Sequence, residues 1–151
     1  MGLRHLKKVS DHDKEAVVET LKSVLRAHDE VAFALLYGSM VTPLIPEQYG
    51  DIDVALYVRP DELRIAEFVL ESRIEAEIYR HLSSLGLNYP PVEVLVLNNA
   101  PYSFLTELFK GVYIVLKEEE ETLADFIEEI GGRSMANFHL LSESLLEVAE
   151  V

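Results

Sequence analysis

The chain has 151 residues, of which 49% are apolar and 26% charged, an ordinary composition for one globular domain with a sizeable core. Its net charge of −14 opposes binding to DNA or RNA, because affinity for nucleic acids depends on Lys and Arg that neutralise phosphates. The absence of cysteine excludes disulfides and thiol chemistry, and no apolar run approaches the roughly 20 residues that cross a bilayer, so we expect a cytoplasmic protein with no membrane contact.

Residues 10–28 are predicted to form the first helix. Ser10 and Asp13 resemble a capping box, and the apolar residues that follow recur on one face, which we expect to cover a sheet. The histidines in this part of the chain lack the spacing of metal ligands and are expected to be surface side chains: His5, His12 and His28.

Two apolar runs then enclose a Gly-Ser turn and a loop. Residues 31–37 are of strand length and stop at Gly38-Ser39, which indicates a buried strand that meets a tight turn. Residues 51–58 begin with Asp51-Ile52-Asp53 and continue with the β-branched and aromatic content of a central strand. Because strand side chains alternate, Asp51 and Asp53 share one face, and the apolar side chains that begin with Ile52 take the other.

The two aspartates place two carboxylates side by side at the start of a strand. Like charges repel, so such a pair needs a cation, hydrogen bonds or water, and Mg²⁺ favours a few carboxylates together with substrate phosphates. A glycine lets the backbone approach a phosphate closely, which predicts a phosphate cradle at Gly38 and Ser39 on the neighbouring strand. Either motif alone is weak, since an isolated Asp-x-Asp is more often a solvated strand end, but their order beside two predicted strands favours a functional site.

The second half of the chain is predicted to supply helices and two further strands. Residues 60–84 read as the longest helix, with Pro60 in its first turn, a four-spaced apolar stripe and Gly86 as its end; His81 near that end is expected on the surface. Strands are expected at residues 92–97 and 112–116, with a short helix between them at 101–109. Residues 117–130 and 133–148 read as amphipathic helices, the first with an acidic, solvated face, and they either finish the core or offer an apolar face to a partner.

Gly38-Ser39 followed after eleven residues by Asp51-Ile52-Asp53 resembles the signature of polymerase-β-type nucleotidyltransferases. More specifically, the sequence resembles the minimal nucleotidyltransferases (MNT) that are often paired with HEPN-domain proteins, and the resemblance covers about residues 31–116. It implies an α+β, polymerase-β-like fold with a mixed sheet of about four strands flanked by helices. It also implies a single domain over residues 1–151, with a core at about 31–116 and a C-terminal helical extension at about 117–149.

The resemblance further implies a transfer of AMP from ATP to a hydroxyl with two Mg²⁺ ions. Asp51, Asp53 and Glu93 correspond to the three metal-binding, catalytic carboxylates, although relatives usually carry an aspartate at the third position. Gly38 and Ser39 would hold the β- and γ-phosphates. The alternative for Glu93 is a side chain that points to water from an edge strand.

In the paired systems that the sequence resembles, the minimal enzyme is the antitoxin and AMPylates a tyrosine of its HEPN toxin. This implies a HEPN-domain toxin as the partner, with homo- or hetero-oligomers formed through the C-terminal helices as a further option. One departure is the loop after Ser39, where relatives commonly have an alanine-arginine-glycine-like sequence and this chain has no Lys or Arg before Asp51. The departure leaves open a catalytically impaired antitoxin that neutralises its HEPN partner by binding. Transfer to a small molecule such as an aminoglycoside is a third option, but the chain has little room for the substrate domain that such enzymes usually add.

Overall fold

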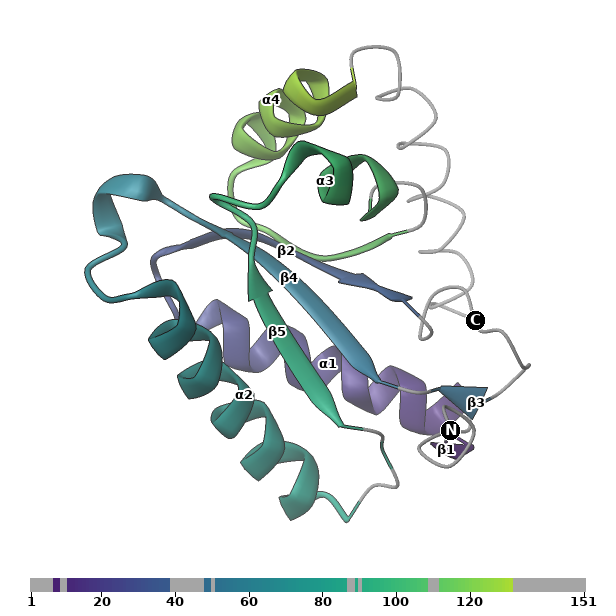
Figure 1. Ribbon diagram of the computed structural model, residues 1–151. Helices are drawn as coiled ribbons and strands as arrows, with labels where there is room; N and C mark the ends of the chain where they lie inside the picture. Colours follow the sequence, from purple (N-terminus) through teal and green to yellow (C-terminus); the bar gives the residue numbers. More distant parts are fainter. Residues whose placement is uncertain are drawn as a thin grey trace.

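A four-stranded sheet lies at the centre of the computed structural model, which describes residues 7–8, 11–38, 48–49, 51–86, 89, 91–108 and 112–131 (Figure 1). The strand order is β5-β4-β2-β6, and the bounds are Val92–Val96 for β5, Ile52–Val58 for β4, Val31–Tyr37 for β2 and Tyr113–Lys117 for β6. β4 runs parallel to β5 and antiparallel to β2, which is antiparallel to β6, so the sheet is mixed as predicted. A two-residue pair, β1 (Lys7–Lys8) with β3 (Gln48–Tyr49), was not predicted.

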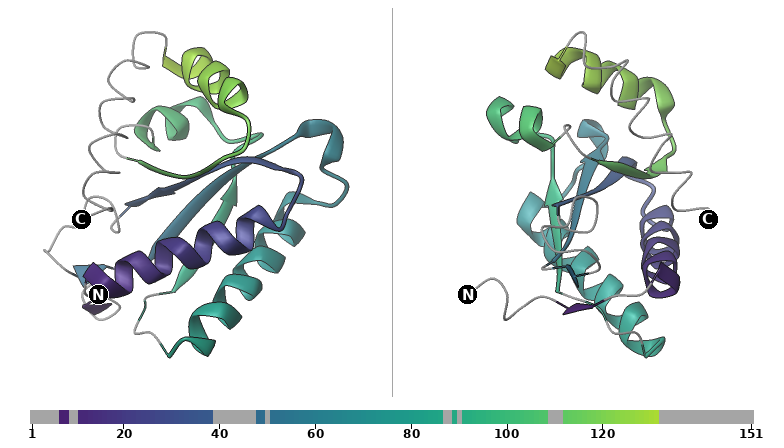
Figure 2. Two further views of the ribbon diagram at one scale, coloured as in Figure 1. Left: turned by 180° about the vertical axis from the view of Figure 1, so that it is seen from behind. Right: turned by 90° about the vertical axis from the view of Figure 1, so that its right-hand side faces the viewer.

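Helices pack on both faces of this sheet (Figures 1 and 2). α1 (Asp11–Arg26) and α2 (Glu67–Ser84) bury their apolar residues on one face, and α3 (Tyr102–Leu108) and α4 (Glu120–Gly131) on the other. The predicted α+β class, with a mixed sheet flanked by helices, is confirmed. Residues 133–148, predicted as a further helix, lie outside the described part of the chain.

The alternation of side chains along β4 decides on which face the candidate site lies. The branched residues that begin with Ile52 and end with Val58 belong to the core cluster under α1 and α2. Ala55 and Tyr57 belong to the opposite cluster, under α3 and α4. Asp53 is an even number of residues from Ala55 and Tyr57, so it lies on the α3–α4 face, which agrees with the predicted separation of the aspartates from the apolar side.

The helix predicted over residues 60–84 begins later than expected. Pro60–Glu62 form a separate 3-10 turn, η3, and the backbone is extended at Leu63 and at Ala66 before α2 begins. Proline and acidic residues favour the first turn of either helix type, so these signals do not say how far the helix continues. The apolar side chains of the predicted stripe that lie within α2 are buried: Leu70, Ile74, Ile78 and Leu82. The chain leaves the helix at Gly86, whose φ of +68° suits glycine.

The remaining elements agree with the predicted ones to within a few residues at each end. None of the helices in the described ranges has both the length and the apolar character that a membrane span requires.

Candidate metal centre

Three side chains from three adjacent strands form a row on the α3–α4 face of the sheet. Tyr37 at the end of β2 lies opposite Asp53 at the start of β4, and Asp53 lies opposite Glu93 in β5. Residues directly opposite each other in paired strands project from the same face, with Cβ atoms about 5 Å apart. The sheet register therefore brings together residues that are up to 56 positions apart in the sequence, from Tyr37 to Glu93.

The structure brings the three predicted carboxylates together. Asp51 precedes Asp53 by two residues, and one carboxylate oxygen from each of Asp51, Asp53 and Glu93 lies within 4.8 Å of the other two. The two aspartates are half-buried and Glu93 is exposed. β5 is an edge strand, as the alternative for Glu93 supposed, yet the Glu93 carboxylate still reaches the aspartates.

The three carboxylates lie close enough for their negative charges to repel one another. Burial raises the pKa of Asp53 to about 6, and the negative charges of Asp51 and Glu93 and a hydrogen bond with Glu93 add to the increase. The negative charges of Asp51 and Glu93 therefore make the ionisation of Asp53 less favourable. An all-oxygen donor set with this repulsion fits a hard divalent cation such as Mg²⁺, which would remove the repulsion on binding. That these residues are the metal ligands stays a prediction.

Gly38 follows β2 directly and lies against Asp53. Its φ of +74° is in the left-handed region, and a Cβ atom on Gly38 would come within 2.2 Å of Asp53 Oδ2. Any other residue would displace the Asp53 carboxylate, so glycine is required at this position for two independent reasons. The predicted cradle thus begins beside the carboxylates, but Ser39 and the loop 40–47 lie outside the described residues, and phosphate binding there stays a prediction.

Tyr37 belongs to the site although the sequence did not single it out. Its ring contacts Phe104 of α3 edge-on, with 6.2 Å between ring centroids. Burial raises the pKa of Tyr37 to about 12, with further increases from the charges of Asp53, Glu93 and Glu71, so the phenol stays protonated at neutral pH and can donate a hydrogen bond. The only sequence signal was its place immediately before Gly38; its position opposite Asp53 comes from the register of β2 and β4.

No histidine of the described residues joins the acidic cluster. His81 is exposed, as predicted. The expectation of a surface side chain is wrong for His28, which is 14% exposed and hydrogen-bonded to Glu77 at 2.7 Å and Glu30 at 3.3 Å, because the turn after α1 packs against α2. His5 and the side chain of His12 lie outside the described part.

Comparisons with known proteins agree with the geometry of this fold. The family model "Polymerase beta, Nucleotidyltransferase" matches residues 19–121, more than half of the chain. No curated protein matches the sequence.

Solved structures of similar fold come from toxin–antitoxin complexes. One is a tri-AMPylated Shewanella oneidensis HEPN toxin in complex with MNT antitoxin, with 14% identity over 91% of this chain and 97% of that chain and a TM-score of 0.54. Another is a toxin–antitoxin with AMP-PNP, with 15% identity over 88% of this chain and 96% of that chain and a TM-score of 0.54. A third is the toxin–antitoxin MntA-HepT, with 14% identity over 89% of this chain and 96% of that chain and a TM-score of 0.51. At these identities the likeness establishes a shared fold.

Proposed function

The chain belongs to the polymerase beta nucleotidyltransferase family, and from this premise we propose that it transfers AMP from ATP to a hydroxyl group with the help of Mg²⁺. In this reaction the hydroxyl oxygen bonds to the α-phosphorus and loses its proton, the bond between the α- and β-phosphates breaks, and pyrophosphate leaves. The observation that carries the proposal is the convergence of Asp51, Asp53 and Glu93 on the α3–α4 face of the sheet, with Gly38 against Asp53. Family membership supplies the class of reaction, and the carboxylate cluster supplies a place for it in this chain.

Each residue of the site has a role in this proposal. Asp51 and Asp53 would hold two Mg²⁺ ions, and Glu93, the most exposed of the three, would help to hold one of them. When bound, the ions lower the pKa of the acceptor hydroxyl and neutralise charge on the triphosphate. Gly38 and Ser39 bind the β- and γ-phosphates through the backbone. Tyr37, protonated at neutral pH, keeps a phenolic O–H at the edge of the cluster that can donate a hydrogen bond.

The acceptor in this proposal is a tyrosine hydroxyl of a HEPN-domain protein, and the chain is its antitoxin. Support comes from the structures of similar fold, which are toxin–antitoxin complexes, one with a tri-AMPylated HEPN toxin and one with AMP-PNP. The net charge of −14 is a further argument for a protein acceptor over a nucleic acid.

A second function is inhibition of the same partner by contact alone. It is favoured by the absence of any Lys or Arg between Gly38 and Asp51, which removes one source of electrostatic stabilisation for a bound triphosphate. In that case the carboxylates could still bind a cation, but no nucleotide would be transferred.

The test is a labelling assay with Mg²⁺, ATP labelled at the α-phosphate, and a HEPN-domain protein from the same organism as the candidate acceptor. We expect label on the HEPN protein, and a loss of roughly a thousandfold with Asp53→Asn, because the variant removes several kcal/mol of transition-state stabilisation. Asp125→Asn, the same change on the exposed face of α4, is the matched control and should label normally. Equal labelling by wild type and Asp53→Asn would contradict the catalytic assignment, and inhibition of the partner without label would favour the contact-only function.

A further inference from the structure

The strand that carries Glu93 is held by another strand on one side only. β5 is at the edge of the sheet, with β4 on its inner side and α2 along its outer side (Figure 1). Alternate backbone groups of an edge strand point away from the sheet, and here Leu97 N donates inward to Leu56 O, whereas the N–H groups of Val94 and Val96 point outward. Unless something accepts from those two N–H groups, the edge is weakly fixed and open to other strands.

Three glutamates at four-residue spacing on α2 accept hydrogen bonds from this edge, and we call them the glutamate ladder. Glu67 Oε1 accepts from Asn99 Nδ2 at 2.6 Å, Glu71 Oε2 from Val96 N at 2.8 Å, and Glu75 Oε1 from Val94 N at 2.8 Å. Four residues of helix rise about 6 Å and two residues of strand about 6.6 Å, so the two repeats match when helix and strand run in opposite directions. The ladder therefore takes the place of a missing neighbouring strand.

The last bond of the ladder lies next to the candidate metal centre. Val94, whose N–H is accepted by Glu75, directly follows Glu93 in the chain. Pairing with β4 sets Glu93 opposite Asp53, and the bond from Glu75 fixes the other side of β5 one residue away. A shift of β5 away from β4 would separate Glu93 from both aspartates, because Asp53 lies in β4 and Asp51 directly precedes β4.

We propose that Glu75 is a positioning residue of the metal centre, which holds the edge strand in place so that Glu93 reaches Asp51 and Asp53. The inference rests on the proposed function, since it assumes that the three carboxylates bind a cation. The hydrogen bond, and not the negative charge, performs the role. Residues that orient metal ligands typically change metal affinity by 10- to 100-fold when they are removed.

The test measures binding of Mn²⁺ alone, as a stand-in for Mg²⁺, by calorimetry on the full chain. We expect Glu75→Ala to weaken Mn²⁺ binding by about tenfold. Glu75→Gln, which keeps an oxygen acceptor and loses the charge, should stay within about twofold of wild type. Glu67→Ala removes the end of the ladder farthest from Glu93 and should leave the affinity unchanged.

Hydrogen exchange at the Val94 amide provides a second measurement that reports the bond itself. We expect exchange to accelerate in Glu75→Ala and to stay slow in Glu75→Gln. Fast exchange with unchanged Mn²⁺ affinity in Glu75→Ala would overturn the inference. A Glu75→Gln variant that binds Mn²⁺ more than twofold weaker would also overturn it, because the effect would then come from the charge of Glu75. This measurement tests the inference even if Glu75→Ala does not fold. A wild-type chain that binds no Mn²⁺ would instead remove the metal centre of the proposed function, and this inference with it.

Discussion

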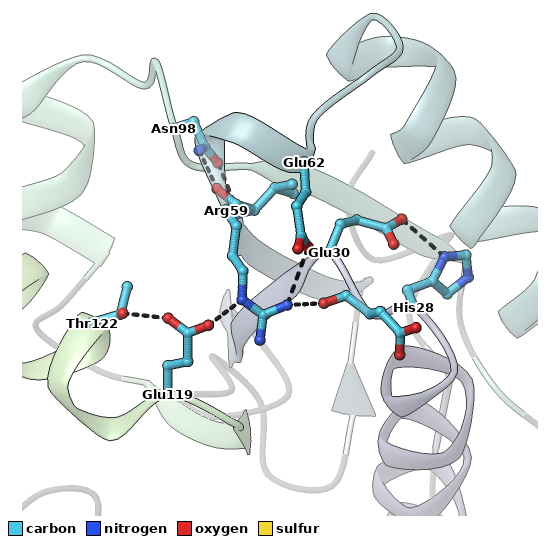
Figure 3. A network of polar contacts seen from close by, with 9 residues as sticks. His28, Glu30, Arg59, Glu62, Asn98, Glu119 and Thr122 are labelled. Atoms are coloured by element: carbon cyan, nitrogen blue, oxygen red, sulfur yellow. Dashed lines mark hydrogen bonds and ion pairs between the residues drawn. The ribbon is translucent and has the colours of Figure 1, made fainter.

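The two ends of β4 carry similar acidic side chains in opposite electrostatic settings. At its start, Asp51, Asp53 and Glu93 crowd together, and burial with their mutual repulsion raises the pKa of Asp53 to about 6. Past its end, Arg59 donates to the carboxylate of Glu119 and to the backbone oxygen of Asp29 (Figure 3). The acidic groups are repelled at one end and paired at the other.

The paired end contains four more hydrogen bonds, two made by His28 and two made by Asn98. His28 lies between the carboxylates of Glu77 and Glu30, and the side-chain amide of Asn98 binds both the N–H and the C=O of Val58, at 3.0 and 2.6 Å. Paired polar groups contribute to stability and require no ligand. A cluster of like charges in a folded chain costs stability, which makes the start of β4 the end at which a ligand is expected.

The largest effect on stability is expected at the paired end, from Arg59→Ala. The substitution removes the guanidinium that donates to the Glu119 carboxylate and to the Asp29 carbonyl, and leaves Glu119 with Thr122 as its remaining side-chain donor, so we expect the Tm to fall by roughly 5 °C in thermal unfolding. Arg26→Ala is the matched control, because Arg26 meets Glu118 at 3.8 Å with both side chains largely exposed, and its Tm should change by less than about 1 °C. Equal shifts in the two variants would show that the network past β4 is no stronger than a surface ion pair.

The opposite sign is expected at the crowded end, from Asp53→Asn. The pKa of Asp53 is about 6 in the folded chain against 3.8 for the ordinary side chain, so the folded state holds the proton to higher pH and its stability falls as the pH rises from about 4 to about 6. Removing the charge should therefore raise the Tm by roughly 3 °C at pH 7.5 in the absence of metal, with no gain near pH 4.

Addition of Mg²⁺ sharpens this test. Wild type should be stabilised and the Asp53→Asn variant much less so, because a cation that binds only the folded chain raises its Tm. A lower Tm for Asp53→Asn at pH 7.5 would contradict the repulsion that distinguishes the two ends.

The smallest effect is expected from His28→Gln, and it depends on pH. Burial lowers the pKa of His28, but the hydrogen bonds and charges of Glu77 and Glu30 raise it by more, so the pKa lies above the ordinary value of 6.5. The stabilisation from the charged imidazole is then fully present below pH 6.5 and is lost as the pH rises through the pKa of the folded state. We expect the variant to lose roughly 2 °C in Tm at pH 5.5 and less at pH 9.

His81→Gln serves as the control for this pH series. His81 is exposed and its Nδ1 hydrogen-bonds the Glu77 carbonyl at 2.9 Å, so its substitution should change the Tm by less than about 1 °C. A loss in His28→Gln that is equal at both pH values would show that the neutral imidazole already makes the contact.

Local sequence patterns predicted most of the elements and two of the three carboxylates. The alternation of side chains along residues 51–58 was enough to place Asp51 and Asp53 on the face opposite the apolar residues. The bounds of β2 are the predicted ones. The resemblance to a known family added Glu93, which no local pattern connects to the aspartates. The start of α2 was misjudged, because Pro60 and the acids after it suit a 3-10 turn as well as an α-helix.

The sequence by itself determined the helical and strand spacing of the apolar side chains, the glycine at position 38 and the charge of −14, because these depend only on neighbouring residues or on composition. Tertiary structure decided which distant residues meet: Tyr37 with Asp53 and Glu93 across three strands, and Glu75 with the edge next to Glu93. The physical reason is that the register of paired strands and the contact of a helix with a sheet edge are fixed by packing over the whole core. No local pattern encodes them, and the pairing of His28 with Glu77, 49 residues apart, was missed for the same reason.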